Sequence, residues 1–122
     1  MKFYPVTDTN TDEAALAADY KTAHAIGAMR IGQSAVFFRS GLKTFYLPFS
    51  CVTRCFRRVM LVPARMCCGR GNLAVENVVL CEGDRELAQI QLPGEKAGKA
   101  ALEELKTKIP GAVFTAPNEK HS

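Results

Sequence analysis

The fold is decided by one stretch of the sequence, residues 34–62, which reads SAVFFRSGLKTFYLPFSCVTRCFRRVMLV. Its valine and phenylalanine residues favour extended strands. Ser40-Gly41 predicts a tight turn between two strands, at residues 35–39 and 43–47. Pro48 ends the second of these strands, because proline has no N–H group to donate to a central ladder.

Residues 52–62 continue the stretch as one unusually long strand. Their apolar alternation changes parity along the way, and a β-bulge near Arg57-Arg58 would reconcile the two halves. Turn signals, the strongest at residues 69–72, and β-branched residues predict four further strands, at residues 29–31, 64–68, 73–81 and 86–92. No helix alternates with these seven strands, so we expect an antiparallel sheet bent into a small barrel or sandwich.

A helix is predicted before the strands, at residues 12–26, which are rich in alanine. Thr9 or Thr11 is the expected N-cap. Gly27 is the expected helix stop. An apolar stripe should face the sheet, formed by Leu16, Tyr20, Ala23 and Gly27. Residues 1–10 are expected to be irregular.

A second, amphipathic helix is predicted after the strands, at residues 95–109, and Pro110-Gly111 ends it. Its inward stripe should be formed by Gly98, Leu102, Leu105 and Ile109. Residues 112–122 are expected to form a tail. The predicted fold class is α+β, a single domain of residues 1–122 in which a seven-stranded antiparallel barrel or bent sheet spans residues 28–93 and carries one helix at each end.

The composition is that of a globular cytoplasmic protein. A chain of 122 residues is long enough to bury its own core. The N-terminal residues lack the apolar region of an export signal, and no run approaches the roughly 18 apolar residues of a membrane span. Five cysteines, an odd number, favour a reducing compartment. The oligomeric state is left open.

Charge is distributed unevenly along the sequence. The net charge is +4, yet residues 20–75 contain no Asp or Glu and carry a local charge of +9. One half of the fold should therefore have a positive potential that suits an anionic partner. The alternative is that strands simply disfavour Asp and Glu, and that the acidic ends fold back over the basic middle.

Two segments resemble the pleckstrin-homology-like (PH-like) superfold, in particular small bacterial PH-like domains of unassigned function. One segment is FYLPFSCVTRCFRRV at residues 45–59, and the other is LAQIQLP at residues 87–93 followed by the C-terminal helix. The resemblance covers residues 28–111 and implies a binding or scaffold module. The N-terminal helix is additional to that fold. The basic pattern by which such domains bind phosphoinositides is absent, since Arg39 and Lys43 stand alone around their turn.

Catalytic and metal-binding chemistry finds little support in the sequence. Cys51 and Cys55 would lie about 13 Å apart on a strand, and the adjacent Cys67 and Cys68 would point to opposite faces. The cysteines do not form the two matched pairs on turns that are usual in structural zinc sites, and no histidine lies near them. His24 is the only histidine outside the tail. We therefore expect buried cysteines, no metal, no cofactor and no enzyme activity.

Arginines are the best candidates for a binding site, because guanidinium groups pair well with phosphate and carboxylate. Five could cluster across adjacent strands: Arg54, Arg57, Arg58, Arg65 and Arg70. The sequence predicts a non-catalytic module that recognises a protein or peptide, either as a strand added to an open sheet edge or in a groove beside the C-terminal helix. One alternative is an anionic lipid or other acidic ligand at the arginines, and another is a small redox enzyme that uses its cysteines. Nucleic acid is a weaker alternative, because aromatics at strand spacing are more often core.

Overall fold

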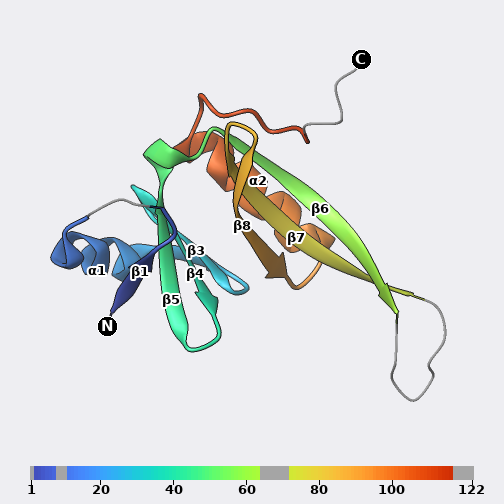
Figure 1. Cartoon of the computed structure of the whole chain (residues 1–122), viewed down its shortest axis with the longest axis horizontal. Coiled ribbons are helices and arrows are strands. Elements are labelled where there is room, and N and C mark those ends of the chain that lie inside the picture. The colour runs from blue at the N-terminus through green and yellow to red at the C-terminus, as the bar shows by residue number, and fades with distance from the viewer. Residues whose placement is uncertain (1, 8–10, 64–71, 117–122) are drawn as a thin grey trace.

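The computed structural model describes residues 2–7, 11–63 and 72–116, which form two helices and two β-sheets (Figure 1). The α+β fold class is therefore confirmed. The described strands lie in two open sheets, of five and three strands, and not in the seven-stranded barrel expected from the sequence. The PH-like resemblance thus stays a prediction.

The five-stranded sheet has the order β1-β5-β4-β3-β2. Its strands are β1 (Phe3–Pro5), β2 (His24–Ile26), β3 (Met29–Ile31), β4 (Ala35–Ser40) and β5 (Lys43–Pro48). Strands β2 to β5 pair as antiparallel hairpins, whereas β1 runs parallel to β5. The expected antiparallel pairing is thus confirmed for every strand pair of the described residues except β1 with β5. The expectation of irregular residues 1–10 is wrong at Phe3–Pro5, and residues 1 and 8–10 lie outside the described residues. The gain from pairing β1 is the burial of Phe3 against Leu16 and Phe37.

The N-terminal helix, α1 (Glu13–Thr22), is shorter than predicted. Asp12, rather than Thr11, caps it by accepting a hydrogen bond from the Ala15 N–H at 3.0 Å. Ala23 takes an extended conformation, and the chain continues as β2 instead of as helix. Gly27 therefore does not stop a helix: its positive φ of 60° makes the turn between β2 and β3. Three members of the predicted stripe do pack on the sheet: Leu16, Tyr20 and Ala23.

The three-stranded sheet has the order β6-β7-β8, with β6 (Arg54–Pro63), β7 (Asn72–Glu82) and β8 (Arg85–Leu92). A 3₁₀ turn, η1 (Phe49–Cys51), joins β5 to β6. The pairing of β6 with β7 is continuous, so the expected bulge near Arg57-Arg58 is wrong. The register shift lies instead between Leu80 and Cys81, where β7 meets β8. The predicted strand at residues 64–68 and nearly all of the turn at 69–72 lie outside the described residues.

The parity change that suggested a bulge has another origin. β8 reaches only as far as the pair Glu76–Leu92, which is level with Val59 of β6. From Val59 onward, β6 and β7 continue as a two-stranded ribbon (Figure 1). In this ribbon, which we call the distal hairpin (residues 59–62 and 73–75), Val59, Met60 and Leu61 are all exposed. Because neither face of the distal hairpin is buried, its apolar residues need not share one parity.

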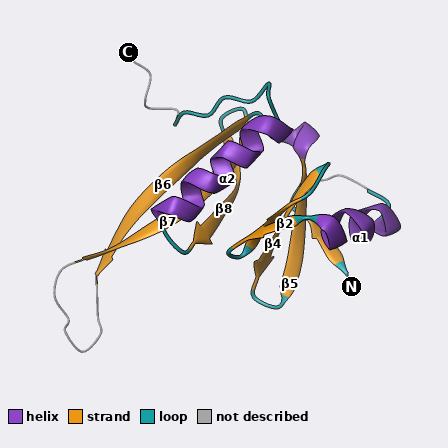
Figure 2. Cartoon of the chain, turned by 180° about the vertical axis from the view of Figure 1, so that it is seen from behind, coloured by secondary structure: helices purple, strands orange, loops and turns teal. Residues whose placement is uncertain are grey.

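The helix α2 (Glu95–Lys108) covers one face of the three-stranded sheet (Figure 2). Its predicted inward stripe is confirmed: Gly98 and Leu105 are buried, while Leu102 and Ile109 are partly buried against the core. This core also takes residues from the five-stranded sheet, so one apolar cluster joins both sheets to α2. A smaller cluster fixes α1 to the opposite face of the five-stranded sheet.

Candidate functional site

Two of the predicted ligand-binding arginines, Arg57 and Arg58, are adjacent and therefore point to opposite faces of β6. Under α2, Arg57 makes a two-pronged ion pair with Glu76, in which Nη2 donates to Oε1 at 3.0 Å and Nε donates to Oε2. Glu76 is only 5% exposed. The hydrogen bond to Glu76 raises the pKa of Arg57. Arg57 is thus neutralised within its own chain.

On the other face of the sheet, Arg58 donates to both carboxylate oxygens of Glu86 and to Gln89 at 2.8 Å. The Glu86 hydrogen bond raises the pKa of Arg58, and the same bond lowers the pKa of the Glu86 carboxyl. Arg54 donates to the Thr115 carbonyl oxygen at 2.6 Å. Arg65 and Arg70 lie outside the described residues. The arginine site stays a prediction, and an anion there would compete with Glu76 and Glu86.

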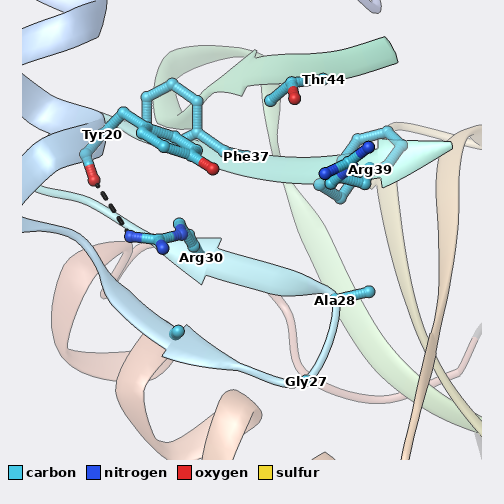
Figure 3. Close-up of a pocket in the computed structure, with 9 residues that line it drawn as sticks. Tyr20, Gly27, Ala28, Arg30, Phe37, Arg39 and Thr44 are labelled. Atoms are coloured by element: carbon cyan, nitrogen blue, oxygen red, sulfur yellow. Dashed lines mark hydrogen bonds between the residues drawn. The ribbon is translucent and has the colours of Figure 1, made fainter. Parts of the chain in front are cut away.

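A different pair of arginines lines a pocket on the α1 face of the five-stranded sheet, next to the end of α1 (Figure 3). Arg30 lies on β3 opposite Phe37 of β4, and Arg39 lies two residues further along β4 on the same face. Such diagonal neighbours have Cα atoms about 7–8 Å apart. Thr44 of β5 lies directly opposite Arg39. The pocket has a volume of about 250 Å³.

Acidic partners are absent from this pocket. Within the described part of the chain, neither Arg30 nor Arg39 makes an ion pair. Arg30 is held instead by Tyr20: its Nη1 donates to the Tyr20 carbonyl oxygen at 3.5 Å, and its guanidinium carbon lies 4.5 Å from the centre of the Tyr20 ring (Figure 3). This arrangement neutralises no charge, so the pocket keeps both cations.

Sequence reasoning missed this pair although the signal was present. Arg30 and Arg39 both lie in the acid-free segment at residues 20–75, on two strands that the sequence predicts at residues 29–31 and 35–39. The sequence does not show the register of β3 with β4, which places Arg30 directly across from Phe37. Arg39 lies two residues after Phe37, so both arginines lie on the same face of the sheet. Arginines are densest along the sequence at residues 54–58, but their density does not show which of them form ion pairs with acidic residues.

A second feature is the outer edge of β6. The extended segment after α2 pairs with the start of this edge: Cys55 N–H donates to the Val113 carbonyl at 2.8 Å, and Val113 N–H donates to the Thr53 carbonyl at 2.9 Å. Since N–H groups alternate sides along a strand, those of Arg57, Val59 and Leu61 point the same way as that of Cys55. They face no strand among the described residues.

The side chains at this edge are apolar and accessible to solvent. The exposed fractions in the distal hairpin are 51% for Val59, 40% for Met60, 67% for Leu61 and 54% for Leu73. Natural edge strands usually carry a charge, a proline or a bulge that prevents pairing with another chain. Residues 59–62 carry none of these.

The described cysteines give the redox alternative little support. Cys55 is fully buried, and burial raises the pKa of its thiol to about 12, with a further contribution from Cys81. Burial also raises the pKa of Cys81. Both thiols are therefore protonated near neutral pH, a form that is a poor nucleophile. Cys51 is half-buried, with its Sγ 3.6 Å from the Thr7 hydroxyl, and Cys67 and Cys68 lie outside the described residues.

Neither a metal centre nor a membrane-spanning helix is found in the described residues. No three His, Cys, Asp or Glu side chains among them gather closely enough to hold a metal ion. Of the described helices, neither is long and apolar enough to cross a membrane.

Comparisons with known proteins give no match: no protein-family model, no curated protein and no solved structure is significantly similar to this chain. Function must therefore be argued from the two features above, the pocket with Arg30 and Arg39 and the open edge of β6.

Proposed function

We propose that this chain is a non-catalytic interaction module that binds an extended segment of a partner protein as an added strand along the open edge of β6. The observation that carries the proposal is the combination, on one edge, of outward-pointing amides at Arg57, Val59 and Leu61 with exposed apolar side chains. Main-chain hydrogen bonds would give the affinity, and side chains at alternate positions the specificity.

The segment after α2 already uses this edge in the same way. Val113 pairs with Arg54 as a parallel one-residue bridge, and its two hydrogen bonds are of normal length. An added strand that continued from this point would meet Arg57, Val59 and Leu61 in turn. We therefore expect the partner to be an extended peptide with apolar residues on both of its faces, to match both faces of the distal hairpin.

The proposal also covers the localisation of the protein, its cofactor, its PH-like resemblance and a second candidate function. We propose a cytoplasmic protein, on the grounds of its odd cysteine count, with no cofactor. The PH-like resemblance implies a binding module only by analogy, because domains of one fold often differ in function. Binding of an acidic ligand is the second candidate function, and the unpaired Arg30 and Arg39 favour it.

A displayed library of random peptides, selected on the immobilised full chain, tests strand addition. We expect enriched peptides with runs of consecutive apolar residues, which place apolar side chains on both faces of a strand. We also expect slower amide hydrogen exchange at Arg57, Val59 and Leu61 when such a peptide is bound. Leu61→Lys should weaken binding roughly tenfold or more. The lysine removes an apolar contact with the peptide, and its charge keeps water at the edge of β6. Leu61 is 67% exposed, so the variant should fold.

Leu42→Lys is the matched control, since Leu42 is 95% exposed and lies in the β4–β5 turn, far from the edge in the sheet order. It should bind the selected peptides like the wild type. Equal binding by the wild type and Leu61→Lys would overturn the proposal. A concentration-dependent dimer that Leu61→Lys abolishes would overturn it too, because the occupant of the edge would then be a second copy of the chain.

A further inference from the structure

We infer that the pocket formed by Arg30, Arg39 and Thr44 is a binding site for a phosphoryl group of a small molecule. The site lies on the five-stranded sheet, whereas the proposed peptide edge belongs to the three-stranded sheet. The two proposals are therefore independent of one another.

The first argument is charge. On the three-stranded sheet, Arg57 is neutralised by Glu76 and Arg58 by Glu86, while Arg54 donates to the Thr115 carbonyl oxygen. Arg30 and Arg39 have no acidic partner among the described residues, although they lie on the same face of neighbouring strands. Both side chains line the same pocket, so an anion bound there would interact favourably with two cations that no acidic side chain neutralises.

The second argument is a hydroxyl in the pocket that makes no bond within the described part of the protein. Thr44 is only 7% exposed and lines the pocket, and its side chain makes no hydrogen bond to another described residue. Figure 3 shows the hydroxyl on the side of Thr44 that faces Phe37 and Arg39. No buried side-chain oxygen or nitrogen among the described residues lacks a hydrogen-bond partner, so solvent reaches the Thr44 hydroxyl from the pocket. A ligand oxygen could take the place of that solvent, because a hydroxyl can both donate and accept a hydrogen bond.

The third argument is preorganisation. Arg30 is only partly exposed and is fixed by the ring and carbonyl of Tyr20, which use one of its nitrogens. Guanidinium has five N–H donors, so several remain for a ligand. Thr44 is fixed by its place in β5. Only Arg39, which is exposed, would have to be ordered when a ligand binds.

The donor set selects the class of anion. Three groups, the two guanidiniums and the hydroxyl, approach one space from three strands. A phosphoryl group offers three acceptor oxygens and close to two negative charges at neutral pH, which matches three donors and two cations. A carboxylate offers two oxygens and one charge. The volume of about 250 Å³ and an apolar lining that includes Ala25 and Phe38 leave room for a small organic group beyond the phosphate.

Amide NMR titrations of the full chain with inorganic phosphate and with glycerol 3-phosphate, at low salt, test this inference. We expect saturable shifts at Ala28, Arg39 and Thr44, with glycerol 3-phosphate bound more tightly because it also fills the apolar part. Arg39→Gln should weaken binding roughly tenfold, and Thr44→Val roughly threefold. Arg58→Gln is the matched control and should leave binding unchanged, since Glu86 already neutralises Arg58.

Vesicles that contain phosphatidic acid distinguish the source of the phosphoryl group. Binding to the vesicles that depends on Arg39, together with the shifts from glycerol 3-phosphate, would identify a lipid headgroup. Shifts without vesicle binding would identify a soluble ligand. Absence of saturable shifts with both small phosphates, or equal loss of binding in Arg58→Gln and Arg39→Gln, would overturn the inference.

Discussion

The arginines of β6 and those of β3 and β4 have the same chemistry but different surroundings. Arg57 and Arg58 meet Glu76 and Glu86, which lie on the other two strands of their own sheet, β7 and β8. Arg30 and Arg39 lie on strands that contain no acid at all. The first pair therefore stabilises the fold, whereas the second pair is available to a ligand. The difference teaches that charge density along a sequence does not locate a binding site, since pairing across strands decides which cations stay free.

The largest predicted effect on the free energy of unfolding is that of removing Arg57, which we expect to stabilise the fold. Arg57→Ala should lower the free energy of unfolding by about 3 kcal/mol, because it leaves the buried Glu76 carboxylate without its partner. Arg39→Ala should change it by less than about 0.5 kcal/mol, because Arg39 makes no ion pair among the described residues. Urea denaturation of both variants measures the two values. Equal losses would contradict the assignment of different roles.

A smaller effect is predicted for the helix that lies over the Arg57–Glu76 pair. A Cβ atom at Gly98 would lie 2.0 Å from the Glu76 carboxylate, so Gly98→Ala must push that group away from Arg57. We expect a loss of about 1–2 kcal/mol, although alanine by itself favours a helix by about 1 kcal/mol.

Glu76→Ala provides the matched background for that substitution. With the carboxylate removed, Gly98→Ala should become neutral or stabilising, because its Cβ then has space. Thermal melts of the four proteins in this double-mutant cycle measure the coupling. A loss of the same size in both backgrounds would show that Gly98 is needed for a reason other than the ion pair.

The smallest effect is predicted for the exposed pair Arg58–Glu86, whose side chains are 35% and 45% exposed. Glu86→Gln should cost no more than about 1 kcal/mol at neutral pH. The bond to Arg58 lowers the pKa of Glu86 below its ordinary value of 4.5, so its contribution is complete above that pH and is lost as the pH falls through the lowered pKa. The melting temperatures of wild type and Glu86→Gln should therefore converge in acid. A constant difference would contradict the ion pair.

Much of the fold follows from sequence pattern. Turn signals and alternation place β3, β4 and β5 nearly at their observed bounds, and the stripe of α2 was predicted correctly. The errors share one cause, which is tertiary pairing. His24–Ile26 follows an alanine-rich segment but becomes β2 through its pairing with β3. Phe3–Pro5 becomes a strand through its pairing with the edge of β5.

The candidate site was less predictable for the same reason. Strand geometry alone predicts that Arg57 and Arg58 lie on opposite faces of β6. Their carboxylate partners are 19 and 28 residues away in the sequence, so the sequence pattern does not reveal them. The change of parity in residues 52–62 was observed correctly and explained wrongly, because a strand that extends beyond its sheet leaves both faces exposed. No local pattern reveals that β8 ends early.

Hydrogen exchange of the arginine Nε–H groups, followed by NMR, compares the two pairs most directly. Arg57 Nε donates to the buried Glu76 carboxylate, and a hydrogen bond of this charged type is worth about 1.5–3 kcal/mol. Its exchange should therefore be roughly ten- to a hundredfold slower than that of Arg39, whose Nε–H has no acceptor among the described residues. Equal exchange rates at Arg57 and Arg39 would contradict the division into stabilising and ligand-ready arginines.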